Sequence, residues 1–368
     1  MRIAIDAHQI GHRRSGSETY TYNLLRHLGH LEPNGDRYVA YLDGPQALDG
    51  ITLWPHLIKK PIPTSISHLR FGLFYPLESW RNSFDVLHSQ FSVPPFLRAR
   101  SVLTVYDLAF ERFPQFFDAK QLLQMKVLMP WSCRRADHII TISEFSKRDL
   151  VETYRVEPER ITVTYPGPSE NCQPLDQGQA QDRLREAYGI DPPFILYVGN
   201  LEPRKNLSRL LEAFAELKRK DLIEDKLVIV GQKAWRYDGI FETLRKNSLE
   251  QRVILTGYVP SVALPAFYNA ASLLMYPSLF EGFGLPVVEA MACGTPVITS
   301  LGSSLEEIAD GAAVLVDPYS VSSMAAAIDK VANSTHIQRE LRQAGLARAA
   351  CFSFRKMAEQ TRSVYHQL

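Results

Sequence analysis

Short apolar segments alternate with helical segments along nearly the whole chain. In its first part the apolar segments fall at 2–6, 38–42, 84–87, 102–106, 138–142 and 161–165. Helices are expected between several of them, including one after Asp118 and one from Ser143. A parallel strand pair needs a crossover connection, so this alternation predicts a doubly wound parallel α/β sheet.

The same alternation restarts in the second part of the chain. Residues 170–182 are polar and turn-rich, which predicts a linker. Further strands are expected at 194–200, 227–231 and 253–256, and the end of the chain has the apolar spacing of an amphipathic helix. We therefore expect two α/β domains, residues 1–170 and 171–352, with a C-terminal helix at about 353–368.

The run YPSLFEGFGLPVVEAMACGTPVI at 276–298 carries the most distinctive chemistry. It predicts a strand end, a glycine-rich loop, a helix from Leu285 and a further strand. Glu281 lies in the loop, and Glu289 lies about one turn inside the helix. Two carboxylates can bind two points of an elongated ligand, and the free N–H groups of a helix start suit an anion. This combination suits a nucleotide-sugar, and the alternative is a surface glutamate pair beside an ordinary loop.

Two adjacent cations, Arg204 and Lys205, follow the predicted strand 194–200 at the start of a helix. Crowding two cations is costly unless an anion neutralises them, and a diphosphate does so through charge-assisted hydrogen bonds. For a lone Arg-Lys pair, the competing interpretation is a solvated helix start.

Two places in the first domain also suggest ligand contacts. A glycine loop containing Gly16 follows the first strand, and Ser17 is expected to cap the next helix, an arrangement that directs N–H groups at a phosphate. A tight turn is the competing interpretation of this loop. Tyr106 and Asp107 end the strand 102–106, at the sheet edge where ligands of open α/β folds collect.

These motifs closely resemble those of the retaining glycosyltransferases of family 4, which have the GT-B architecture. Glu281 and Glu289 match the E-x7-E signature of that family. Gly199, Arg204 and Lys205 match its G-x-x-x-P-R-K-N motif. The resemblance implies two Rossmann-like domains that face each other across a cleft, with the C-terminal helix packed back on the first domain.

The resemblance also implies roles for individual residues. Arg204 and Lys205 would bind the donor diphosphate in place of a metal ion, so no cofactor is expected. Glu281 would hold sugar hydroxyls and Glu289 the ribose diol. The predicted catalytic residues are Arg204, Lys205, Glu281 and Asp107. The predicted substrate-binding residues are Gly16, Ser17, Tyr106, Gly199, Tyr258, Val259, Gly282, Phe283, Gly284, Leu285 and Glu289, with Tyr258 and Val259 beside the base.

The sequence departs from the family pattern at Tyr106. Family members often have a histidine at this position, followed by an aspartate that Asp107 matches. Tyrosine can donate a hydrogen bond but does not titrate near neutrality, so the sequence leaves open whether Tyr106 takes over the role of the histidine.

The expected function is retaining transfer of a hexose, with mannose from GDP-mannose as the first choice and a UDP-hexose as the second. The expected acceptor is a glycan or lipid-linked sugar in surface polysaccharide or lipopolysaccharide synthesis. A GT-B epimerase or phosphorylase remains possible on the same motifs, as does a non-catalytic sugar-binding protein. The intact glutamate pair and Arg-Lys pair argue against a non-catalytic protein.

The composition of the chain indicates which classes of partner and which cellular compartment to expect. The net charge of +1 gives no basic excess for a nucleic-acid partner, and the four cysteines are widely spaced, as expected in a reducing cytoplasm. The uncharged run 253–280 is broken by glycine and proline, so it is not expected to span a membrane. The apolar segments 69–80 and 122–135 are candidates for peripheral contact with the inner face of a membrane.

Overall fold

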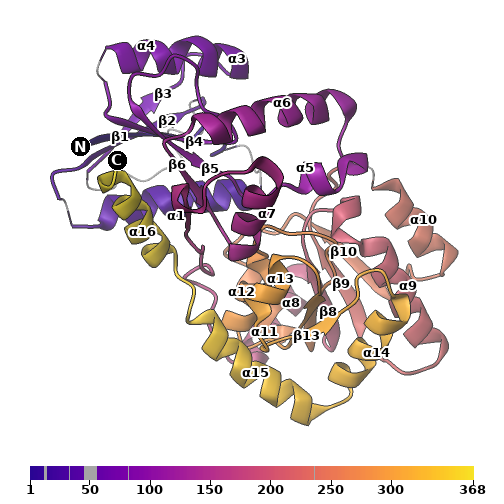
Figure 1. Ribbon diagram of the computed structural model, residues 1–368. Helices are drawn as coiled ribbons and strands as arrows, with labels where there is room; N and C mark the ends of the chain where they lie inside the picture. Colours follow the sequence, from indigo (N-terminus) through magenta and orange to yellow (C-terminus); the bar gives the residue numbers. More distant parts are fainter. Residues whose placement is uncertain (12–14, 33, 45–55, 82, 236) are drawn as a thin grey trace. The chain divides into compact units, whose positions relative to one another are not determined.

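The computed structural model describes all residues except 12–14, 33, 45–55, 82 and 236 (Figure 1). The chain forms two compact units, Met1–Pro166 with Ser353–Leu368, and Gly167–Phe352. We call them unit 1 and unit 2. The division falls after Pro166, whereas the sequence suggested a division after residue 170.

Unit 1 contains a seven-stranded sheet in the order β3-β2-β1-β4-β5-β6-β7. All of its paired strands are parallel. The strands are β1 (Arg2–Asp6), β2 (Arg37–Leu42), β3 (Leu57–Pro61), β4 (Val86–Gln90), β5 (Arg100–Thr104), β6 (His138–Thr141) and β7 (Ile161–Val163). The strand order changes direction between β1 and β4, which is where doubly wound sheets bind ligands at their carboxyl edge.

Helices cover both faces of this sheet (Figure 1). They are α1 (Ser15–His30), α3 (Ser67–Leu69), the π-helical η1 (Arg70–Phe74), α4 (Tyr75–Trp80), α5 (Ala109–Arg112), the short 3-10 turns η2 (Pro114–Phe116) and η3 (Pro158–Arg160), α6 (Ala119–Arg135), α7 (Glu144–Tyr154) and α16 (Phe354–His366). Asp118 caps α6 and Ser143 caps α7, as the sequence predicted.

The C-terminal helix α16 belongs to unit 1. The Tyr365 hydroxyl lies 2.6 Å from Nδ1 of the buried His88 on β4, and Nε2 of His88 lies 2.6 Å from the Thr104 hydroxyl on β5. Burial lowers the pKa of His88 to about 3, so the imidazole is neutral in this network. The last helix therefore completes the core of a unit whose other elements lie more than 180 residues earlier in the chain.

Unit 2 contains a six-stranded sheet in the order β10-β9-β8-β11-β12-β13, again with parallel pairs. Its strands are β8 (Phe194–Val198), β9 (Lys226–Val230), β10 (Val253–Gly257), β11 (Leu273–Tyr276), β12 (Val297–Ser300) and β13 (Val314–Val316). Its helices are α8 (Gln177–Tyr188), the 3-10 turn η4 (Pro203–Lys205), α9 (Leu207–Arg219), α10 (Asp238–Lys246), α11 (Leu264–Ala270), α12 (Leu285–Ala292), α13 (Ser304–Ala309), α14 (Val321–Ala332) and α15 (Thr335–Ala349).

The parallel sheets confirm the predicted fold class, but two local predictions were wrong. Helix α8 starts at Gln177, inside the stretch expected to be a linker; only Ala180 and Leu184 are buried on it, too few for a visible apolar period. Helix α1 starts at Ser15, so Gly16 and Ser17 lie in its first turn and Ser17 is not its cap.

The uncharged run 253–280 forms β10, α11 and β11, as its prolines and glycines suggested. Within the part of the chain that the structure describes, no helix has the length and apolar character needed to cross a bilayer.

Candidate active site

The predicted donor loop of unit 2 connects β11 to α12 through residues 277–284. Gly284, the residue before α12, has a φ of 100°, and a Cβ atom there would lie 2.4 Å from Cδ2 of Leu305. The Ser304 hydroxyl donates a hydrogen bond of 2.7 Å to the carbonyl of Glu281. Helix α13 therefore fixes the backbone that presents Glu281.

The side chain of Glu281 lies at the centre of a buried cluster of charges. Lys205 Nζ donates to its Oε1 at 2.6 Å, and Arg204 donates to its Oε2 at 3.1 Å. The Tyr276 hydroxyl also donates to Oε1, at 3.0 Å. Three residues singled out from the sequence therefore meet in direct contact, and Tyr276 joins them.

Backbone contacts hold the Arg204–Lys205 turn against the donor loop. The Arg204 carbonyl accepts from the Leu279 N–H at 2.9 Å, and the Arg204 guanidinium donates to the Phe280 carbonyl at 2.6 Å. The side-chain amide of Asn206 donates to the Pro277 carbonyl at 3.0 Å. The cations and Glu281 are thus held at fixed positions by two loops that are distant in sequence.

A second buried carboxylate, Glu202, belongs to the same cluster. It accepts from Arg204 at 2.7 Å, and only 2% of the residue is exposed. Lys205 also donates to the Tyr276 hydroxyl at 2.6 Å. Neither Glu202 nor Tyr276 was predicted as a site residue, although an acid two residues before the Arg-Lys pair was a usable signal.

The cluster balances two cations with two carboxylates. Burial raises the pKa of Glu281, but the Lys205 and Arg204 charges outweigh that effect and lower the pKa to about 2. Glu281 is therefore ionised at neutral pH, and it partly neutralises the cations before any ligand binds. Such a cluster can bind an anion beside Arg204 and Lys205 while its carboxylate accepts hydrogen bonds from hydroxyl groups.

The second glutamate of the predicted signature has a different environment. Glu289 lies one turn inside α12, and its Oε2 accepts from the Tyr268 hydroxyl of α11 at 2.8 Å. Burial raises the pKa of Glu289 to about 7, although the hydrogen bond from Tyr268 lowers it. The carboxyl group therefore exchanges between acid and carboxylate near neutral pH, and as the acid it can donate a hydrogen bond to a hydroxyl oxygen.

The other residues predicted in unit 2 follow three strands of its sheet, β8, β10 and β11. Gly199 follows β8, and its N–H donates to the Val230 carbonyl at 2.9 Å. Phe283 is buried in edge contact with Phe352, while Gly282 is buried and Leu285 begins α12. Tyr258, which is exposed, and Val259, which is buried, follow β10, two strands from β8 in the sheet order. Contact of these two with a base stays a prediction.

The residues predicted in unit 1 lie at the carboxyl edge of its sheet. The Tyr106 hydroxyl donates to Oε1 of Gln90 at 2.7 Å, and burial raises its pKa well above the usual value. Asp107 accepts from the Ala109 N–H at 2.9 Å where α5 begins. Gly16 is exposed in the first turn of α1, and Ser17 is half-buried beside it. Substrate contact by these four residues stays a prediction.

Comparisons with known proteins give the same picture for both units. The family model "Glycosyltransferase Family 4" matches residues 14–169, and "Glycosyl transferases group 1" matches residues 180–348. The O-antigen chain mannosyltransferase B of Escherichia coli is 30% identical over 274 residues, which are 74% of this chain and 72% of that protein.

Two solved structures share the fold over the whole chain. Sucrose-phosphate synthase from Thermosynechococcus elongatus has a TM-score of 0.80 and 21% identity, with 100% of this chain and 98% of that chain covered. HepE from Anabaena, in complex with UDP and glucose, has a TM-score of 0.79 and 18% identity, with 100% of both chains covered. The two matched family models and the mannosyltransferase relative show that the chain belongs to glycosyltransferase family 4, and its fold is the GT-B architecture of that family.

Proposed function

We propose that the chain transfers mannose from GDP-mannose, with retention at the anomeric carbon, to a glycan or lipid-linked acceptor. The product would be part of a surface polysaccharide or lipopolysaccharide. The contact of Arg204 and Lys205 with Glu281 carries the proposal of sugar transfer from a diphosphate. The choice of mannose is supported by the O-antigen chain mannosyltransferase B of Escherichia coli.

In this reaction the bond between the anomeric carbon and the diphosphate oxygen breaks, and the acceptor hydroxyl forms the new bond. Negative charge develops on the leaving diphosphate, where Arg204 and Lys205 would stabilise the transition state. Glu281 would hold the sugar hydroxyls, and Glu289 would bind the ribose diol. Attack from the front face would pass the acceptor proton to the departing phosphate, without a covalent enzyme intermediate.

Because the two cations would neutralise the leaving group, we propose that transfer needs no metal ion or other cofactor. Full activity in the presence of a chelator is the expected result. The reaction would take place in the cytoplasm, at the inner face of the membrane if its acceptor is lipid-linked.

A UDP-hexose is the second candidate donor, and HepE from Anabaena, whose structure holds UDP and glucose, supports it. A calorimetric screen of GDP- and UDP-sugars against the full chain separates the two donors. Submicromolar to micromolar binding of GDP-mannose alone supports the first choice, whereas preference for a UDP-hexose replaces it.

The reaction class is tested by Lys205→Ala, which removes the cation that contacts both Glu281 and Tyr276. Sugar transfer should fall by at least about a hundred-fold, because a fixed charge at the leaving group typically contributes that much. Lys220→Ala is the matched control, since Lys220 pairs with Glu216 on the exposed side of α9 and should retain full activity.

Near-normal transfer by folded Lys205→Ala protein would refute the assignment. Incubation of the unaltered chain with nucleotide-sugar alone separates other GT-B activities from transfer. Epimerised donor would indicate an epimerase, and phosphate-dependent turnover would indicate a phosphorylase. Binding of donor without turnover or hydrolysis would indicate a non-catalytic protein.

A further inference from the structure

A group of buried polar side chains lies at the carboxyl edge of the unit 1 sheet. Asp6 ends β1, and none of the residue is exposed. Its Oδ1 accepts from the His8 N–H at 3.3 Å and lies 3.0 Å from Nδ1 of the His8 ring. Its Oδ2 has no hydrogen-bond partner among the residues that the structure describes. A fully buried carboxylate therefore keeps one oxygen that can accept a further hydrogen bond.

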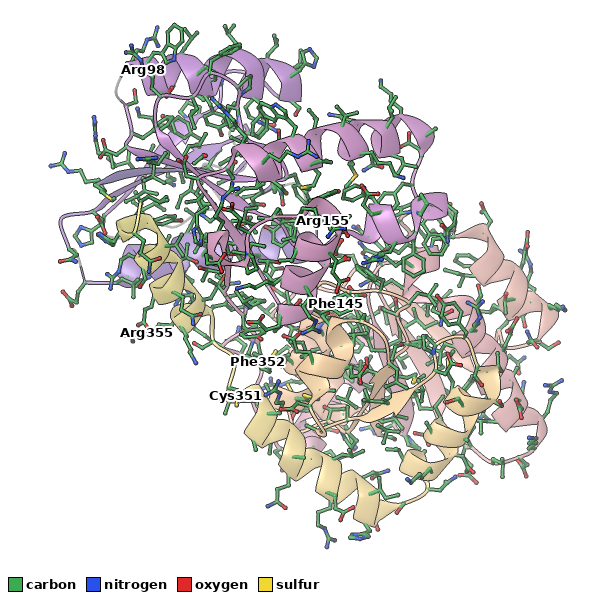
Figure 2. All side chains as sticks on the ribbon, in the orientation of Figure 1. Arg98, Phe145, Arg155, Cys351, Phe352 and Arg355 are labelled. Atoms are coloured by element: carbon green, nitrogen blue, oxygen red, sulfur yellow. The ribbon has the colours of Figure 1, made fainter. Side chains whose placement is uncertain are left out.

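Arg70 adds a buried cation to this group. It begins η1, a π-helical turn between α3 and α4, and such turns occur frequently at functional sites. Only 3% of Arg70 is exposed, and its Nε has no hydrogen-bond partner in the described part of the chain. By contrast Arg98, which follows α4 in the sequence, lies exposed at the surface of the same unit (Figure 2). Burial raises the pKa of Asp6, but the interactions with His8 and Arg70 outweigh burial and hold it below its usual value, so Asp6 is ionised.

Two hydroxyl groups complete the group. Ala4 on β1 pairs with Leu87 on β4, and paired residues of parallel strands point to one face. Asp6 and Ser89 each lie two residues farther along these strands, so they share that face as well. The Tyr75 hydroxyl of α4 lies close to Asp6, and burial, followed by the Asp6 charge, raises its pKa well above the usual value. Neither hydroxyl has a hydrogen-bond partner of normal geometry among the described residues.

We call Asp6, His8, Arg70, Tyr75 and Ser89 the Asp6 site. Buried polar groups nearly always have partners, so several unpaired donors and acceptors in one place indicate a polar ligand. The location agrees, because the sheet order changes direction between β1 and β4, where doubly wound sheets bind ligands. The charges of Asp6 and Arg70 balance, which favours a neutral ligand over an anion. Sugar hydroxyls both donate and accept hydrogen bonds, so they match this set of groups.

His8 connects the Asp6 site to the surface of the unit. Its side chain is 14% exposed, whereas that of Asp6 is fully buried. Nδ1 faces the Asp6 carboxylate and therefore carries a proton, which leaves Nε2 directed away from Asp6. A hydroxyl group can bind Nε2 in either protonation state of the ring, because it can donate to the nitrogen or accept from it. A sugar that enters this site would therefore meet His8 before it reaches Asp6.

We propose that the Asp6 site binds a neutral sugar residue of the acceptor. Asp6 Oδ2 would accept a hydrogen bond from one hydroxyl, Arg70 would donate to the next, and His8 Nε2 would bind a third. These contacts would select the acceptor by the positions of its hydroxyls, since a sugar that leaves a buried charge unpaired binds less well. The identification of this sugar as the acceptor rests on the proposed function, whereas the binding of a sugar at this site does not.

The test is NMR spectroscopy of the full chain with isotope-labelled histidine and without donor. The probes are the methyl α-glycosides of mannose, glucose and N-acetylglucosamine. At least one of them should shift the ring signals of His8 and leave those of His336 unchanged, since His336 is exposed on α15 of unit 2. No shift of His8 with any of the three would overturn the proposal. A shift with inorganic phosphate alone would also overturn it, because it would assign the site to anions.

The two buried charges are tested by variants with matched controls. Arg70→Met should bind the same glycoside at least about ten-fold more weakly, because a charged donor is lost, and the exposed Arg98→Met should bind it normally. Asp6→Asn should have the same effect as Arg70→Met, because a carboxylate accepts more strongly than an amide. Its control is Asp36→Asn, which removes another buried carboxylate of unit 1 that lies 2.8 Å from a histidine, His366. Unchanged binding by folded Arg70→Met or Asp6→Asn would overturn the proposal.

His8→Gln keeps the test decisive if those variants do not fold, because the His8 side chain is partly exposed. It should weaken binding at least about three-fold, since one hydrogen bond is lost. For this variant, binding is measured from the signals of the glycoside itself. Unchanged binding by His8→Gln would count against the site as fully as unchanged binding by the other two.

Transfer assays separate a failure of this site from a failure of the proposed function. With GDP-mannose and the glycoside that binds best, Arg70→Met should raise the KM for the glycoside at least about ten-fold and leave the KM for GDP-mannose unchanged. Sugar transfer by the unaltered chain without a shift at His8 would overturn this site and leave the proposed function in place. Glycoside binding at His8 without transfer or donor hydrolysis would contradict the proposed function and leave this site in place.

Discussion

At the scale of single residues, Glu281 has two effects that oppose each other. It stabilises the folded chain by neutralising Arg204 and Lys205, and it competes with any anion that those cations bind. We expect Glu281→Gln to lower the free energy of unfolding by about 3 kcal/mol, because two nearly buried cations lose a counter-charge. The same variant should bind GDP more tightly and transfer sugar more slowly.

Three measurements separate a structural role of Glu281 from a functional one. Chemical denaturation measures stability, calorimetry measures GDP affinity, and a turnover assay measures transfer. Glu216→Gln, which removes the half-buried partner of the exposed Lys220, is the control and should change none of the three measurably. Weaker GDP binding by a folded Glu281→Gln variant would contradict the competition between carboxylate and diphosphate.

Glu289 is expected to destabilise the fold as pH rises. Its pKa of about 7 exceeds the usual value of 4.5, so the folded chain holds a proton that the unfolded chain releases. Stability should therefore decline between about pH 4.5 and pH 7, by about 2 kcal/mol for this half-buried group. Denaturation of Glu289→Gln across this range should show a flatter profile. An identical slope in both proteins would mean that another group carries the pH dependence.

The sequence predicted three of the residues that form the cluster, but not how they pair. The Arg-Lys turn and the glutamate loop each have a recognisable local pattern, so Arg204, Lys205 and Glu281 could be selected. The contact between Lys205 and Glu281 spans 76 residues of sequence and depends on the packing of η4 against the β11–α12 loop. Tyr276 was missed because its role exists only once those segments meet, and Glu202 was missed although it lies two residues from its partner Arg204.

At the scale of elements, the entry into α12 depends on one backbone conformation. Gly284→Ala would place a methyl group 2.4 Å from Leu305 Cδ2 at a φ of 100°. We expect the free energy of unfolding to fall by about 3 kcal/mol, from backbone strain and overpacking together, with a loss of transfer because the Glu281 loop shifts.

Gly302→Ala isolates the backbone contribution. Gly302 has a φ of 85° and open space around its Cβ position, so its substitution should cost only about 1 kcal/mol. Thermal unfolding of both variants checks the difference. Equal losses of stability in the two variants would show that Leu305 moves away from the added methyl group without destabilising the fold.

Helix starts were predicted best where a capping side chain marks them. Asp118 and Ser143 marked helix starts correctly because the side chain of each accepts hydrogen bonds from N–H groups in the first turn of its helix. The edge strand β3 was not predicted, since only Leu57 of its five residues is buried. Helix α8 was taken for a linker for the same reason: weak burial leaves a weak periodicity.

At the scale of the whole molecule, the C-terminal helix α16 belongs to unit 1, which is otherwise formed by the N-terminal part of the chain. Met357, Ala358, Val364 and Tyr365 of α16 are buried, all in unit 1. Truncation of the chain after Phe352 should therefore lower the free energy of unfolding of unit 1 by about 5 kcal/mol or more, while the core of unit 2 stays intact. Scanning calorimetry should show one transition moved to lower temperature and the other retained, with donor binding kept and transfer lost.

Two point variants on α16 give stability losses with which the loss on truncation can be compared. Tyr365→Phe leaves Nδ1 of His88 without its hydrogen-bond partner in a buried position, which should cost unit 1 about 1–2 kcal/mol. Arg355→Ala removes an exposed ion pair with Glu359 from the same helix and should cost less than about 0.5 kcal/mol. If the shortened chain loses both transitions together, the two units unfold as one cooperative body and α16 stabilises both. If neither transition of the shortened chain moves to lower temperature, α16 does not stabilise unit 1.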